Sequence, residues 1–229
     1  MKRIFLFLVM ITCLLFAADQ VKPSIHVSGL GEVAFAPNIA FLTVGMEDVY
    51  ANVQEGQNAV SEKINKFQQS LEGIITIKDI ETAVISIQRR YSYNAGKEEF
   101  QGYAIKQTLK IKVNNFKNIG LVVDKAVSCG LNSLGSLAFS HTTPAAYNQK
   151  ALQIALLDAN KKSEIIGKTM GLANIKVEQI SENSSLAGVA EQPMYRGMAL
   201  ASLVDASATQ VVPGELKVTV RVNVDYSFK

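Results

Sequence analysis

The sequence has 229 residues, of which 48% are hydrophobic and 19% charged, and this suits one globular domain or at most two. Such an apolar content excludes disorder for most of the chain. The formal net charge is only +3, so composition gives no sign of a protein that binds nucleic acid or another polyanion. Trp is absent and His occurs twice, which bears on chemistry because His is the commonest metal ligand and general base.

The first 18 residues have the layout of a secretory signal peptide. A basic start at Met1 to Arg3 precedes Ile4 to Phe16, which is apolar apart from two positions, and Ala17-Ala18 then meets polar residues. The apolar run is shorter than the roughly 20 residues of a membrane-spanning helix. We therefore expect cleavage of residues 1–18, a periplasmic or secreted mature chain, and no stable membrane span after cleavage. An uncleaved membrane anchor is the alternative.

Cleavage changes the charge and the cysteine content. It removes two cations, Lys2 and Arg3, and no acid, so the net charge falls from +3 to +1. It also removes Cys13 and leaves Cys129 alone, so no intramolecular disulfide can form. We expect Cys129 to be a small buried hydrophobe rather than a reactive thiol.

The first half of the mature chain predicts two strands, a helix and a hairpin. Residues 24–33 look extended, and residues 39–49 are apolar on both faces, as in a strand between two layers. Asn52 followed three residues later by Glu55 is typical of a helix start, and that helix should end near residue 73. Residues 80–93 and 100–113 predict two antiparallel strands, joined through a turn rich in Asn and Gly.

The second half predicts two helices and three strands. One helix follows Asn115 and ends at Gly130, and a strand covers residues 131–140. Thr143-Pro144 opens a longer helix that runs to about residue 170. A short strand covers residues 175–181 and a strongly alternating strand covers residues 216–228. The apolar stripe expected for the longer helix contains Leu152, Leu156, Ala159, Ile166 and Met170.

The resulting element order is β-β-α-β-β-α-β-α-β-β. Consecutive strands with clean alternation indicate an α+β protein with a largely antiparallel sheet and three helices packed on one face. We expect a single domain over residues 19–229.

One segment departs from this pattern. Residues 187–209 are rich in Ala, Gly, Met and Ser and have only three charged residues. A loop of this length is unusual inside a compact domain, so the segment is either a flexible excursion or an assembly arm. The candidate arm residues are Met194, Tyr195, Met198, Leu200 and Leu203.

Motifs that carry chemistry are missing or incomplete. Gly29-x-Gly31 imitates a dinucleotide fingerprint, but a strand follows it where that motif needs a helix. His26 and His141 are far apart and lack any partner at metal-ligand spacing. Two arginines beside tyrosines at residues 89–93 are commoner in a hairpin strand than in a nucleic-acid site. The sequence therefore predicts no catalytic residues, no cofactor, no metal and no nucleic-acid partner.

A set of weak motifs, in a specific order over about residues 24–228, resembles the SIMPL-domain family. The opening motif is Ile25-x-Val27-x-Gly29-x-Gly31-Glu32-Val33 followed by Pro37-Asn38-x-Ala40. The later motifs are Asp79-Ile80-x-Thr82, Gly102-Tyr103, Asp124-x-Ala126, Ala151-x-x-x-Ala155-x-x-Asp158-Ala159-x-x-Lys162 and Pro213-Gly214. The chain departs from the usual pattern at Asn38, Ser163 and Gly167, where Asp, Ala and Ala are common in the family. The resemblance implies an exported protein without established catalytic residues, a homo-oligomer, and a link to oxidative-stress resistance.

These observations favour a non-enzymatic exported protein that self-associates in the cell envelope. One alternative is a periplasmic module that binds a small apolar ligand or an envelope partner in a pocket between sheet and helices. A second alternative is a cryptic hydrolase that uses His26 or His141 with a nearby serine.

Overall fold

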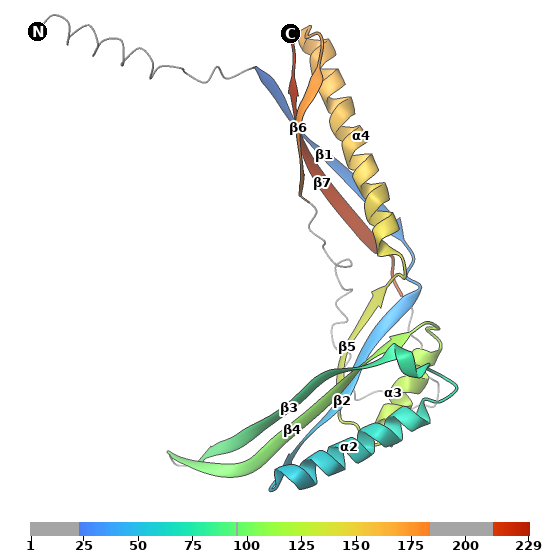
Figure 1. Ribbon diagram of the computed structural model, residues 1–229, viewed down its shortest axis with the longest axis vertical. Helices are drawn as coiled ribbons and strands as arrows, with labels where there is room; N and C mark the ends of the chain where they lie inside the picture. Colours follow the sequence, from blue (N-terminus) through green and yellow to red (C-terminus); the bar gives the residue numbers. More distant parts are fainter. Residues whose placement is uncertain (1–22, 95, 184–212) are drawn as a thin grey trace, which may run out of the picture. The chain divides into compact units, whose positions relative to one another are not determined.

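The computed structural model describes residues 23–94, 96–183 and 213–229, and it confirms the α+β class and the predicted element order (Figure 1). A short 3-10 helix, η1, is the one addition. In chain order the elements are β1 (Ser24–Phe35), β2 (Ile39–Tyr50), α2 (Val53–Ser70), η1 (Ile77–Asp79), β3 (Ile80–Asn94), β4 (Lys97–Val113), α3 (Asn118–Ser128), β5 (Ser133–Ser140), α4 (Pro144–Met170), β6 (Lys176–Asn183) and β7 (Leu216–Ser227).

The strands form two sheets, which corrects the expectation of a single sheet. One has the order β1-β7-β6 and the other the order β3-β4-β2-β5. Alternation along a strand shows which side chains share a face, but it does not show which strand lies beside which. The first and last strands of the described chain pair with each other, and no local pattern indicates that pairing.

Contacts divide the chain into two compact units. The described part of the first unit comprises residues 23–31, 152–183 and 220–229, and that of the second comprises residues 32–94, 96–151 and 213–219. The expected single domain over residues 19–229 stays a prediction.

In the second unit, α2 and α3 cover the four-stranded sheet. The side chain of Asn52 accepts hydrogen bonds from the backbone N–H groups of Gln54 and Glu55, so the helix begins where its capping residue predicts. Ile64 and Phe67 on α2 are buried against the sheet, together with Leu109 and Ile111 of β4. This apolar layer fills the space between the helices and the strands.

The third helix, α4, packs on the other sheet, so the expectation that all three helices share one face is wrong. Figure 1 shows α4 alongside β1, β6 and β7. Its buried face consists of small residues at intervals of four, whereas of the predicted stripe only Ala159 is fully buried and Met170 is 69% exposed. The buried residues are Ala151, Ala155, Ala159, Ser163 and Gly167.

Close approach of the backbones explains the small residues. A Cβ atom built on Gly29 of β1 would overlap the Ala155 carbonyl oxygen and lie 2.9 Å from the Cβ of Ala159. Large aliphatic side chains on this face would push the helix away from the strand, so the expected stripe of Leu and Ile lies at its margins and beyond.

Gly29→Ala should therefore lower the free energy of unfolding by about 2–3 kcal/mol, because backbone would have to move to admit the methyl group. Gly214→Ala is the matched control, since a Cβ atom there meets nothing within 4 Å. It should change stability by less than about 0.5 kcal/mol. Urea unfolding followed by circular dichroism measures both, and equal effects of the two substitutions would contradict this account.

Candidate functional sites

The long helix α4 is tied to the backbone of β1 by one ion pair. The Asp158 carboxylate accepts a hydrogen bond from the Leu30 N–H (2.9 Å) and another from the Lys162 ammonium (2.7 Å). Lys162 also donates to the carbonyl oxygen of Ser28 (2.7 Å). These two side chains bracket Gly29 with polar bonds on both sides, and we call the group the α4–β1 clamp.

The clamp lowers the pKa of Asp158. The hydrogen bond from Lys162 contributes most, followed by the hydrogen bond from the Leu30 N–H, and both favour the ionised carboxylate. A carboxylate held ionised by such bonds suits positioning rather than proton transfer. The sequence places Asp158 and Lys162 four residues apart on one helix face, but that spacing does not show that both reach β1.

A second feature is the face of the β3–β4 hairpin. Cross-strand partners share a face of a sheet, and the register pairs Arg89 with Tyr103, Tyr91 with Phe100, and Tyr93 with Glu98. The rings of Tyr91 and Phe100 meet edge to face at 5.6 Å between centroids, and those of Phe100 and Tyr103 at 5.3 Å. We call Tyr91, Tyr93, Phe100 and Tyr103 the hairpin aromatic face.

This face continues the core-facing side of the sheet beyond the end of its helical cover. Near the start of α2, Ile105 is 2% exposed and lies against Gly56, where an added Cβ atom would overlap its side chain. Figure 1 shows the hairpin extending past the start of α2. There the exposed fractions rise to 42% for Tyr91 and 49% for Phe100. Apolar side chains of the same face are thus buried at one end and in water at the other.

The hairpin also presents an edge and a balanced pair of charges. Strand β3 lies at the end of the sheet order, so one side of its backbone has no strand partner within the described sheet. Such edges are templates for pairing with another chain. Arg89 and Glu98 lie on the aromatic face, and the hydroxyl of Tyr93 donates to Glu98 (3.2 Å). An apolar patch with one cation and one anion is complementary to a second copy of itself.

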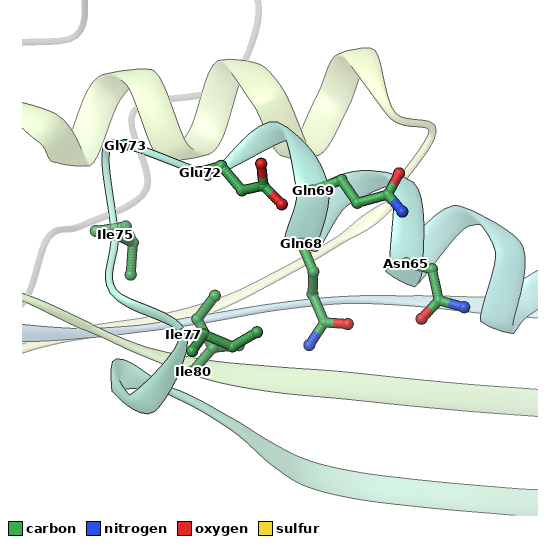
Figure 2. Close-up of a pocket in the computed structure, with 8 residues that line it drawn as sticks. All are labelled: Asn65, Gln68, Gln69, Glu72, Gly73, Ile75, Ile77 and Ile80. Carbon is green, nitrogen blue, oxygen red and sulfur yellow. The ribbon is translucent and has the colours of Figure 1, made fainter.

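A shallow pocket of about 380 Å³ lies where α2 ends. In Figure 2, Gln68 points from the helix toward Ile77 and Ile80, which lie beneath it. The helix contributes amide groups to the lining, the turn after it contributes the carboxylate of Glu72, and Ile77 is 78% exposed. An open and partly polar recess of this kind does not favour the small apolar ligand of the first alternative.

The two histidines have separate surroundings. The ring of His141 packs edge-on to Phe35 and Tyr147, whose own rings are stacked at 3.8 Å, and its Nδ1 accepts a hydrogen bond from the Thr143 N–H (3.1 Å). The ring of His26 bonds to Ser24 and Asp225. Over the residues that the structure describes, no group of three or more His, Cys, Asp or Glu side chains is placed to hold a metal ion.

Three further predictions concern Cys129, the segment at residues 187–209 and the absence of a membrane span. Cys129 is buried with a free thiol, as expected. The candidate arm residues Met194, Tyr195, Met198, Leu200 and Leu203 lie outside the described residues. In the described part of the chain, none of the helices combines the length and the apolar character needed to cross a bilayer.

Comparison with known proteins assigns the family. The SIMPL description, a protein of unknown function (DUF541), matches residues 25–226. The chain is 26% identical to the 26 kDa periplasmic immunogenic protein of Brucella melitensis biotype 1, over 90% of this chain and 84% of that protein. It is 28% identical to the uncharacterized protein YggE of Escherichia coli K12, over 60% of this chain and 56% of that protein.

The chain therefore belongs to the SIMPL family, as its motifs predicted. The Brucella relative is named as a periplasmic protein, and the expectation of a periplasmic or secreted location is thereby confirmed. The family description carries no enzymatic activity. In the structure, the family motifs of β1 and the long helix come together at the α4–β1 clamp.

Asp158→Asn should lower the free energy of unfolding at neutral pH, because the neutral amide loses the charge-assisted bond to Lys162. Since the pKa of Asp158 is lowered in the folded chain, the stabilisation is complete above the unfolded value of about 3.9 and is lost as pH falls through the folded value. The difference between wild type and variant should therefore shrink below about pH 4.

Glu164→Gln is the control on the same helix, because Glu164 accepts its hydrogen bond from the Asn160 amide and not from a cation. Urea unfolding at neutral and acidic pH measures all three proteins. A difference between wild type and Asp158→Asn that stays constant down to the lowest pH would contradict the role given to the clamp.

Proposed function

We propose that this SIMPL-family chain is an exported, non-enzymatic protein that builds a homo-oligomer in the cell envelope after loss of residues 1–18. The observation that carries the proposal is the hairpin aromatic face, an apolar surface that the described residues leave exposed beyond the start of α2. Leaving Tyr91, Tyr93 and Phe100 in water costs free energy that a second copy would recover.

A second copy is the occupant that the surface favours. The face carries Arg89 and Glu98 together, so two copies related by a two-fold axis across the hairpin can bring the cation of one toward the anion of the other. A partner surface that carries charge of only one sign would place a like charge opposite either Arg89 or Glu98. The edge of β3 beside this face adds backbone donors and acceptors for the same contact.

The segment at residues 187–209 remains a second candidate for assembly, on the strength of its apolar sequence alone. The link to oxidative-stress resistance rests on the family resemblance alone and stays a prediction.

Light scattering after size-exclusion chromatography should give the mature protein a mass that is a multiple of the mass of one chain without residues 1–18. The double substitution Tyr91→Ser with Phe100→Ser should shift it toward monomer, because it removes the exposed apolar area from the contact. The free energy of unfolding should change little, since both side chains are about half exposed.

Leu157→Ser is the matched control, because Leu157 is a large apolar residue on α4 that is 69% exposed and belongs to the other compact unit of the chain. It should leave the mass unchanged. Deletion of residues 187–209 separates the two candidate surfaces. A wild-type protein that is strictly monomeric at all concentrations would overturn the proposal.

A further inference from the structure

Three side chains on the three-stranded sheet form a hydrogen-bonded chain that neither the clamp nor the hairpin uses. The Ser24 hydroxyl lies 2.8 Å from Nε2 of His26, and Nδ1 of His26 lies 2.6 Å from a carboxylate oxygen of Asp225. Hydroxyl, imidazole and carboxylate therefore follow one another in the order that activates a serine.

The strand geometry produces this order. Ser24 and His26 are two residues apart on β1, so their side chains lie on the same face of the strand. Asp225 lies on β7, the neighbouring strand in the sheet. His26 and Asp225, which are 199 positions apart, thus meet, and no local motif in the sequence predicts this contact.

The chemistry of the groups assigns the protons. A carboxylate only accepts hydrogen bonds, so the N–H of the neutral imidazole is on Nδ1 and donates to Asp225. The lone pair is then on Nε2, where it accepts the Ser24 hydroxyl. This is the tautomer in which imidazole can take the serine proton.

We propose that Ser24 is an acylation site: its hydroxyl accepts an acyl group from small activated acyl donors such as esters of good leaving groups. The bond from Oγ to the acyl carbon forms while the bond from that carbon to the leaving oxygen breaks. The Oγ proton passes to Nε2 of His26 and from there to the leaving group. Asp225 holds the ring and stabilises the imidazolium that forms.

The exposure of the site determines the kind of donor. Ser24 is exposed, and the side chains of His26 and Asp225 are 69% and 36% exposed. A small donor can therefore reach the serine directly, whereas recognition of a large substrate would need an enclosing pocket. This inference does not depend on self-association, because all three residues belong to one compact unit of one chain.

The other histidine is a built-in comparison. The Thr143 hydroxyl lies 3.2 Å from Nδ1 of His141, but the opposite nitrogen faces the Tyr147 hydroxyl at 3.4 Å instead of a carboxylate. The Thr143 N–H already donates to that Nδ1. Thr143 should therefore be unreactive under conditions that acylate Ser24.

The test uses the full mature protein and p-nitrophenyl acetate, with peptide mass spectrometry to measure acetylation at Ser24 and at Thr143 over time. Ser24 should be acetylated first. His26→Gln should slow this by about 10²-fold, the usual contribution of a positioned general base. Asp225→Asn should also slow it, and His141→Gln should leave it unchanged.

Circular dichroism checks that each variant is folded. The spectrum should be unchanged, because an exposed strand face should tolerate these substitutions. Acetylation of Ser24 at the rate of Thr143 would overturn the proposal. So would an undiminished rate in His26→Gln, because the histidine would then be only a cross-strand pairing residue.

Discussion

The close approach of α4 to β1 is the constraint on which the three-stranded sheet depends. At Gly29 there is no room for a side chain between the strand and the helix, and the helix residues that face this glycine are Ala155 and Ala159. Asp158 and Lys162 then bond to the strand backbone on either side of that glycine. Two long elements far apart in sequence are thereby held at one distance and in one register, and bonds to backbone N–H and C=O groups specify that register.

The four-stranded sheet solves a different packing problem. Its core-facing side is covered by α2 and α3 over β2 and the inner part of β4, where the large aliphatic side chains are buried. The hairpin extends beyond that cover and carries the same apolar alternation into solvent. An apolar surface that the described helices leave uncovered is the feature on which the proposed self-association rests, and it distinguishes the hairpin from the partly polar recess at the end of α2.

Local patterns were enough to predict the elements and the burial of one cysteine. Asn52 identified a helix start, Gly130 a helix end with a positive φ of 81°, and Cys129 a buried thiol. The stripe expected on α4 was wrong because helical periodicity identifies large apolar residues, whereas the buried face was selected for small ones. Of the Ser24, His26 and Asp225 chain, the sequence offered only His26 with a nearby serine as an alternative, because the carboxylate partner comes from the last strand.

The sequence by itself determined the α+β class, the order of the elements and membership of the SIMPL family, because periodicity, capping residues and ordered motifs are local properties of the chain. Only the tertiary structure decided that the strands form two sheets, that β1 lies beside β7, and that Gly29, Asp158 and Lys162 act together. The pairing of distant strands and the distance between backbones depend on contacts between residues far apart in the chain. A pattern within one strand or helix does not specify those contacts.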